Sequence, residues 1–307
     1  MKEKEETMHS GTPRRWLLAG GTGLIGRRLT DALRSRGHEV KVLSRKGPGG
    51  WSPGEKPLSL ELLKDVDVVV NLSGASVGEG RWTAKRKKEL LESRIQPIAT
   101  LEEALSQLGT KPFFIQASAI GYYGFEQTEP FFTEKTEPGK DFLARLCVDW
   151  EAAAHTLQPV TAGLSILRIG VVLDAQGGAL PKMLQPVRWF AGAAPGSGNQ
   201  GISWVHVEDV IAAILFVEAH RHQGVFNVVA PEPQTMTQFM REAAKQLHRP
   251  FWPFPIPAFV LKLAMGEQAD LVVKGSLVKP SRLLDVGYVF QFPKLPDALK
   301  NLVTLQA

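Results

Sequence analysis

The stretch GGTGLIG, residues 20–26, decides the fold, and it follows directly after the apolar run WLLA, residues 16–19. This order predicts a buried strand, a tight glycine turn and the start of a helix. Gly20 permits the turn, Gly23 lets a pyrophosphate approach the backbone, and Gly26 lets the helix pack closely on the sheet. The alternative interpretation is an ordinary packing cluster of glycines.

The context of this turn favours a nucleotide site. A helix is predicted over residues 27–36 and a second strand over residues 39–43, which completes most of a dinucleotide-binding βαβ unit. Free N–H groups at a helix N-terminus face the phosphates in such a unit. We therefore expect the cofactor pyrophosphate to contact Gly20, Thr22, Gly23, Leu24, Ile25 and Gly26.

The residues after the second predicted strand indicate which dinucleotide is preferred. An NAD site places a carboxylate there for the ribose 2′-hydroxyl, whereas residues 40–46, VKVLSRK, contain no acid. Arg45, with Ser44 beside it, can bind a 2′-phosphate through charge-assisted hydrogen bonds, and Lys46 adds charge. A solvated basic loop is the alternative. We expect the cofactor to be NADP rather than NAD.

The composition is that of an ordinary globular protein. Its 307 residues are 44% apolar and 22% charged, with a net charge of +5, which suits one large domain or a large domain with a smaller lobe. The basic residues form no stripe with interleaved aromatics, so we expect a small-molecule substrate and no nucleic-acid partner. The densest basic cluster, residues 85–88, indicates a solvated helix face, with a polyanion patch as the alternative. The oligomeric state is left open.

Cysteine content and the lengths of the apolar runs narrow the class of protein further. The single cysteine, Cys147, permits no disulfide framework and no zinc-type Cys/His spacing, so no metal site is expected. The first residues are charged without an apolar signal core, and no run reaches the length of a membrane helix. These features predict a cytoplasmic protein with no membrane partner and a disordered leader at residues 1–13.

Strands and helices alternate through the first two thirds of the chain, which predicts a parallel sheet with helices on both faces. The expected fold class is α/β, a doubly wound Rossmann sheet with a smaller, mostly helical C-terminal lobe. We place the Rossmann domain, with part of the substrate lobe, at residues 14–248 and an extension packing on that lobe at 249–307. One strand is expected over 164–172, and Pro97 is expected to begin a new helix.

Five further segments resemble a known family. They are NLSGA at 71–75, RWT at 81–83, QASAIGYYG at 116–124, WEAA at 150–153 and VKPSRL at 278–283. With the glycine turn they resemble extended short-chain dehydrogenases/reductases, and more narrowly the atypical sugar-nucleotide-epimerase-like group called YfcH-type epimerase family proteins. The resemblance implies an NADP-binding oxidoreductase or epimerase/dehydratase-like protein that acts on a carbonyl or sugar-nucleotide-like substrate.

The resemblance also implies further cofactor contacts. Leu72, Ser73 and Gly74 match the strand end that lies under the adenine and ribose in the family. Arg94 stands where extended members usually place an asparagine, and an arginine there can reach the pyrophosphate while Glu89 orients it. The alternative is a surface Arg–Glu pair that contributes little stability.

The usual catalytic pair of this family is missing. Members use a serine and a Tyr-x-x-x-Lys helix, in which the tyrosine exchanges the proton and the lysine lowers its pKa. Alignment at Glu151 puts Leu143 in the tyrosine position and Cys147 in the lysine position. None of the three tyrosines is followed by a lysine four residues later.

Three interpretations therefore stay open. The chemistry can be retained with relocated groups, for which Ser118, Tyr122 and Tyr123 are the candidates because they follow a strand at the carboxyl edge of the sheet. The protein can instead bind NADP without catalysis, as a regulator or scaffold. In the third interpretation Cys147 is a redox or nucleophilic residue, although a lone cysteine on an apolar helix face usually packs.

Three later residues complete the expectations. Asp209 is expected to cap the helix that follows the segment WVHV at 204–207, and His206 is expected to be structural. Arg168, within the strand predicted at 164–172, either anchors the substrate or pairs with a buried acid.

Overall fold

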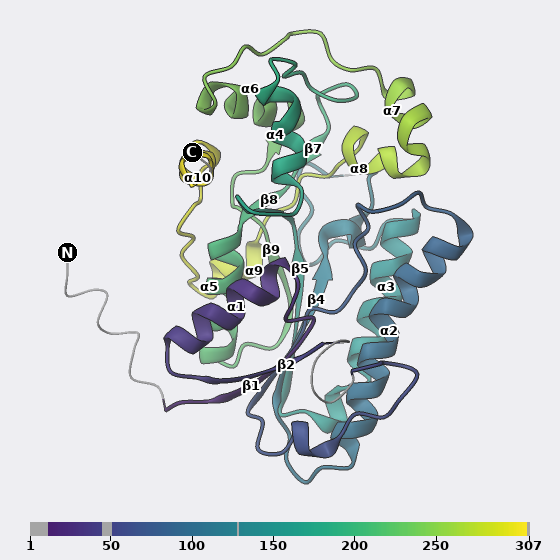
Figure 1. The fold of residues 1–307 in the computed structure, drawn as a ribbon, viewed down its shortest axis with the longest axis vertical. Helices are drawn as coiled ribbons and strands as arrows, with labels where there is room; N and C mark the ends of the chain where they lie inside the picture. The colour runs from purple at the N-terminus through teal and green to yellow at the C-terminus, as the bar shows by residue number, and fades with distance from the viewer. Residues whose placement is uncertain (1–11, 45–50, 128, 306–307) are drawn as a thin grey trace, which may run out of the picture.

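The computed structural model describes residues 12–44, 51–127 and 129–305, so Arg45, Lys46 and most of the expected leader lie outside the described residues. Six parallel strands form the main sheet, in the order β2-β1-β3-β4-β5-β9 (Figure 1). They are β1 (Arg15–Ala19), β2 (Glu39–Leu43), β3 (Val68–Asn71), β4 (Phe113–Ala119), β5 (Gly163–Ile169) and β9 (Gly224–Val228). The order reverses between β1 and β3, where ligands bind in open α/β sheets.

Helices cover both faces of the sheet, which confirms the doubly wound α/β prediction. α1 (Leu24–Ser35) and α5 (Val207–Ala219) pack together on one face, and α2 (Ala84–Ser106) and α3 (Phe142–His155) pack together on the other (Figure 1). The central strands β1, β3, β4 and β5 are buried on both sides, which suits their mostly apolar sequences. This arrangement brings the carboxyl ends of β1, β3 and β4 to one edge.

The prediction of a helix break at Pro97 is wrong, because α2 runs unbroken through this residue. A proline inside a helix removes one backbone hydrogen bond and crowds the preceding turn. Here Pro97 is itself buried, and it lies on a stripe with Leu90, Ile98 and Leu101 that faces the core. Burial of this stripe against the sheet and α3 outweighs the local cost of the proline.

The single strand expected over residues 164–172 is in fact two strands that pair with different partners. β5 ends at Ile169, and β6 (Val171–Leu173) pairs with β8 (Trp204–His206) in a second small sheet. Gly170 marks the change, since a Cβ there would lie 2.5 Å from the Ser203 carbonyl oxygen. The close approach of the two backbones therefore requires glycine at this position.

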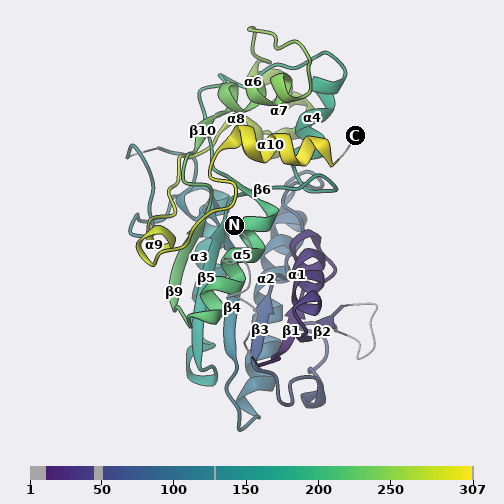
Figure 2. The same cartoon turned by 90° about the vertical axis from the view of Figure 1, so that its left-hand side faces the viewer.

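A smaller lobe covers the carboxyl edge of the sheet and is mostly helical, as predicted (Figure 2). It contains α4 (Leu180–Arg188), α6 (Met236–Gln246), α7 (Ala258–Met265), α8 (Asp270–Val273) and α10 (Leu295–Thr304), and the antiparallel pair of β7 (Gly201–Ile202) with β10 (Gln234–Thr235). α10 packs on α6, whereas α9 (Ser281–Asp285) returns to β9 in the main sheet. In the described parts of the chain, no helix combines the length and apolarity needed to cross a membrane.

The expected cap at Asp209 is wrong, since the adjacent histidine performs that task. The Nδ1 atom of His206 accepts a hydrogen bond from the Glu208 N–H at 3.1 Å, and its Nε2 atom lies 3.2 Å from Asn301 of α10. Asp209 instead accepts hydrogen bonds from the N–H groups of Gln291 and Phe292. Both residues thus fasten the C-terminal segment to the start of α5, which makes His206 structural, as expected.

His206 gives the stability of the fold a pH dependence. Burial lowers its pKa to about 4, so the folded state stays neutral while the unfolded chain takes up a proton below about pH 6.5. The contribution to the free energy of unfolding is complete above that pH and falls by about 2 kcal/mol on acidification to about pH 5. Urea unfolding at both pH values measures this loss, and His206→Asn, which keeps the cap, should lose less. Equal losses in both proteins would refute the assignment.

Candidate functional site

The glycine turn after β1 has little room for side chains. Gly20 has a φ of +77°, and a Cβ there would lie 2.7 Å from the backbone of Leu72. A Cβ at Gly26 would lie 2.5 Å from the Gly20 carbonyl oxygen, whereas one at Gly23 would meet only that oxygen, at 3.3 Å. Gly20 and Gly26 therefore shape the turn, while the position of Gly23 is open.

The N-terminus of α1 is arranged to receive an anion. Gly23 is the N-cap, so no side chain bonds the first N–H groups, and the first turn contains no acid. Together with the helix dipole, such uncapped N–H groups attract phosphate. Ser44 follows β2, whose last residue pairs with Ala19 just before the turn. The turn residues expected to bind the cofactor and Ser44 thus lie at neighbouring strand ends.

A buried polar group is fixed at the end of β3. Asn71 donates to Gln116 on β4 at 2.9 Å and accepts from the Ser73 N–H at 3.1 Å. These bonds fix the path of Leu72 and Ser73 as the chain leaves the sheet. The Ser73 hydroxyl is buried and has no hydrogen-bond partner. A buried unpaired hydroxyl costs free energy, which suits a group that meets a ligand.

Arg94 of α2 packs beneath this strand end. It is buried, a Cβ on Gly74 would lie 3.2 Å from its Cζ atom, and its guanidinium stacks 4.9 Å from the Trp150 ring. Within the described ranges no carboxylate forms an ion pair with it, and burial lowers its pKa. The pairing expected with Glu89 is wrong: that exposed carboxylate lies 2.7 Å from Arg86, on the outer side of the helix. A buried cation without an acid is a candidate anion ligand.

Ser118, at the end of β4, belongs to a buried ion-pair network. Its hydroxyl donates to Glu151 of α3 at 2.6 Å. Arg168 of β5 donates to both oxygens of the same carboxylate, each at 2.8 Å, and this pairing raises the pKa of the guanidinium. The alternative in which Arg168 pairs with a buried acid is therefore the one observed.

The two neighbouring tyrosines contact Arg168 in different ways. Its Cζ atom lies 3.3 Å from the centre of the Tyr122 ring, and its Nη1 atom donates to the Tyr123 hydroxyl at 2.9 Å. Tyr123 in turn donates to Asn227 of β9 at 2.7 Å, and burial raises its pKa to about 12. The structure thus gathers Ser118, Tyr122 and Tyr123 around one ion pair, with both tyrosines on Arg168 and Ser118 on Glu151.

The C-terminal segment extends this network. The Asn227 side chain donates to the Lys279 carbonyl oxygen at 3.0 Å, and its backbone N–H donates to Glu134. Arg282 donates to carbonyl oxygens in and beside β9, at Val225 and Gln223. A continuous series of hydrogen bonds therefore runs from residue 279, through Asn227, Tyr123, Arg168 and Glu151, to Ser118.

The positions of the missing catalytic pair are buried in α3. Leu143 packs in a small apolar cluster with Trp82, Leu90 and Leu146. Burial raises the pKa of the Cys147 thiol to about 12, so it stays protonated and packs beneath Gly121. This environment does not favour Cys147 as a nucleophile.

Glu151 and Asn227 are the site residues that our sequence reasoning missed. Glu151 served only as an alignment landmark, although it falls on an apolar stretch of one helix face, four residues after Cys147 and three before Ala154. A charge in such a stretch requires an internal partner. The opposite charge at Arg168, in a buried central strand, supplied the matching signal. Asn227 carried no such signal.

Comparison with known proteins identifies the family. Residues 16–229 match the NAD dependent epimerase/dehydratase family, and residues 256–302 match a domain of unknown function, DUF1731. Epimerase family protein YfhF of Bacillus subtilis is 36% identical over 298 residues, covering 93% of this chain and 97% of that protein. Mouse epimerase family protein SDR39U1 is 37% identical over 295 residues, covering 94% and 99%.

Solved structures give the same result. The crystal structure of human epimerase family protein SDR39U1 with NADPH superimposes with a TM-score of 0.85 at 33% identity, covering 94% of this chain and 99% of that one. A nucleoside-diphosphate sugar epimerase from Corynebacterium glutamicum gives a TM-score of 0.77 at 27% identity, covering 97% of this chain and 59% of that one. This chain belongs to the NAD dependent epimerase/dehydratase family.

Proposed function

We propose that this protein binds NADP at the carboxyl edge of the sheet and acts as an oxidoreductase or epimerase/dehydratase-like enzyme. The observation that carries the cofactor assignment is the uncapped N-terminus of α1 beside the strand end that covers the buried Arg94. The human relative, 33% identical, was crystallised with NADPH. The substrate class we propose is a carbonyl or sugar-nucleotide-like compound.

The residues present fit this cofactor. The N–H groups at Leu24 and Ile25 would meet the pyrophosphate, and Arg94 would add a positive charge. Ser73, whose hydroxyl is unpaired, would meet the adenosine side. Ser44 and Arg45 would bind the 2′-phosphate. When bound, the nicotinamide supplies or accepts a hydride.

The chain's own groups would contact the substrate around Arg168. The Ser118 hydroxyl donates its hydrogen bond to Glu151, so its oxygen remains an acceptor for a substrate hydroxyl. The Tyr123 hydroxyl already donates to Asn227 and accepts from Arg168, which makes it a positioning residue. Tyr122, half-buried and stacked on Arg168, is the better candidate for proton exchange.

These roles predict the outcome of four substitutions. Conversion of a panel of carbonyls and nucleotide sugars is measured first, both by the change in NADPH and by product analysis, because an epimerase or dehydratase returns its hydride and consumes no net cofactor. The active substrate is then used for the variants. Tyr122→Phe or Ser118→Ala should reduce kcat by about 10²–10⁴-fold, while Tyr123→Phe should reduce it less. Cys147→Ser should leave it nearly unchanged. Loss of activity in Cys147→Ser alone, with the fold intact, would reverse these roles.

The alternative function is that of an NADP-binding regulator or scaffold without turnover. The burial of Leu143 and Cys147 at the positions of the usual tyrosine and lysine favours it. Tight NADPH binding with no conversion of any compound in the panel would support this alternative over the enzyme.

A further inference from the structure

Large apolar side chains are exposed together in two segments of the smaller lobe. They are Trp189, Phe190, Trp252, Phe254, Phe259, Val260 and Leu263, and we call them the aromatic patch. Phe254, Phe259 and Leu263 are 79%, 72% and 82% exposed. The other exposed large apolar residues in the described chain are scattered, as is normal for a protein surface.

The two segments of the patch are hydrogen-bonded to each other. The backbone N–H of Trp252 donates to the Gly192 carbonyl oxygen at 2.8 Å, and its indole N–H donates to the Phe190 carbonyl oxygen at 2.7 Å. Both figures of the whole chain place α4, the connection after α6, and α7 at the same end of the molecule (Figures 1 and 2). The aromatic patch therefore belongs to one end of the smaller lobe.

Helix α7 supplies an apolar face that nothing in the described chain covers. None of its residues is buried. Phe259, Val260 and Leu263 are exposed, whereas Leu261 and Met265 are half-buried. A helix of this apolarity normally buries a face in the core, so its exposed side is suited to an external apolar surface.

The charged residues within the segments that carry the patch are all basic. Residues 175–207 and 243–266 contain no aspartate or glutamate, while Lys182, Arg188, Arg249 and Lys262 fall within them. The Arg249 guanidinium lies 4.5 Å from the Phe190 ring, and Lys262 lies 4.0 Å from Asp270 outside these segments. Such a surface is complementary to an anionic partner.

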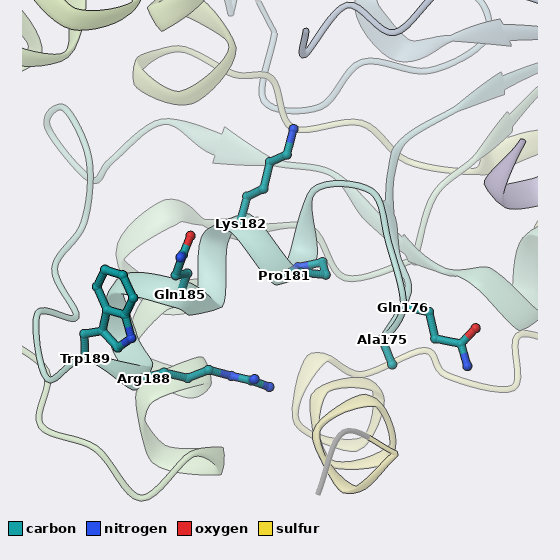
Figure 3. Close-up of a pocket in the computed structure, with 7 residues that line it drawn as sticks. All are labelled: Ala175, Gln176, Pro181, Lys182, Gln185, Arg188 and Trp189. Carbon is teal, nitrogen blue, oxygen red and sulfur yellow. The ribbon is translucent and has the colours of Figure 1, made fainter.

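A pocket beside Trp189 also combines basic side chains with an exposed aromatic ring. Its lining includes Lys182, Gln185 and Arg188 of α4 and Trp189, the residue that follows this helix (Figure 3). The lining contains no acid. Cationic and amide groups next to an exposed indole fit a phosphate headgroup, with the ring at the level where apolar and polar layers meet.

We propose that the aromatic patch seats the protein on the surface of an anionic lipid bilayer. The exposed rings and Leu263 enter the interface between headgroups and acyl chains, and the surrounding cations contact lipid phosphates. The expectation of no membrane partner rested on the lack of a spanning segment, which surface binding does not require. This proposal is independent of the proposed enzymatic function.

The test uses the full chain and two kinds of vesicle. We expect co-flotation with vesicles of phosphatidylcholine and phosphatidylglycerol, but not with phosphatidylcholine alone. Trp189 and Trp252 are exposed while the other five tryptophans are buried. Binding should therefore shift tryptophan emission to shorter wavelength, and brominated lipid should quench it.

Matched variants distinguish binding through the aromatic patch from a general effect of exposed apolar side chains. The triple variant Phe254→Ser, Phe259→Ser and Leu263→Ser should lower vesicle partitioning about 100-fold. The control, Val289→Ser with Leu305→Ser, removes side chains elsewhere that are 82% and 66% exposed, and should bind as the wild type does. Equal binding to both vesicle types, or unchanged binding of the triple variant, would overturn the proposal. A dimer in solution that the triple variant dissociates, without vesicle binding by the wild type, would assign the patch to self-association instead.

Discussion

Gly23→Val is expected to abolish NADPH binding while the protein stays folded. A Cβ at this position meets only the Gly20 carbonyl oxygen, at 3.3 Å, and the backbone φ of −73° suits any residue. The branched side chain would stand at the uncapped start of α1, where the pyrophosphate is proposed to bind. Loss of two or more charge-assisted hydrogen bonds lowers affinity by at least about 100-fold.

Gly26→Ala is the matched control, because it affects the same turn in a different way. Its Cβ would lie 2.5 Å from both the Gly20 carbonyl oxygen and the Gly21 Cα atom. We expect this smaller substitution to destabilise the fold, whereas the larger one at Gly23 does not. Calorimetric titration with NADPH and thermal unfolding separate the two effects. A folded Gly23→Val protein that binds NADPH normally would show that the phosphates lie elsewhere.

Arg168→Met is expected to cause the largest loss of stability among the site variants. The substitution leaves the buried Glu151 carboxylate without its two hydrogen bonds from Arg168, and removes the donor to Tyr123. Removing one partner of a buried ion pair typically costs about 3–5 kcal/mol. Urea unfolding at neutral pH measures the change in the free energy of unfolding.

The double variant Glu151→Leu with Arg168→Met should be more stable than Arg168→Met alone. It removes the unpaired charge along with its partner, and a pair of apolar residues costs less in this position. With the single variant Glu151→Leu and the intact protein, these two variants form a double-mutant cycle, whose coupling energy reports the interaction. A coupling energy near zero would mean that the ion pair does not hold the network together.

The glycine turn and the alternation of strands and helices were sufficient to predict the main sheet, because both are local signals. The course of the chain at Pro97 and Gly170 was not predictable in this way. The packing of α2 keeps the helix continuous through Pro97. At Gly170 the close approach of Ser203, from a distant segment, accompanies the change from one sheet to the other. Tertiary contacts overrule local preference at both positions.

The candidate site was likewise predictable from local sequence signals only in part. The spacing of glycines indicated where a dinucleotide would bind, and a family motif placed Ser118 and the two tyrosines after one strand. The partners of these residues come from separate elements, with Glu151 on α3 and Arg168 on β5. Without an expectation of which charges pair, the sequence could not show that Tyr123 is enclosed rather than free.

The most direct test of the cofactor assignment is a calorimetric comparison of NADPH with NADH. The intact protein should bind NADPH more tightly, because residues 40–46 offer a serine and an arginine where an NAD site has a carboxylate. In Arg45→Ala the preference should shrink by about 1.5–3 kcal/mol. Equal affinity of the intact protein for both dinucleotides would contradict the assignment of NADP.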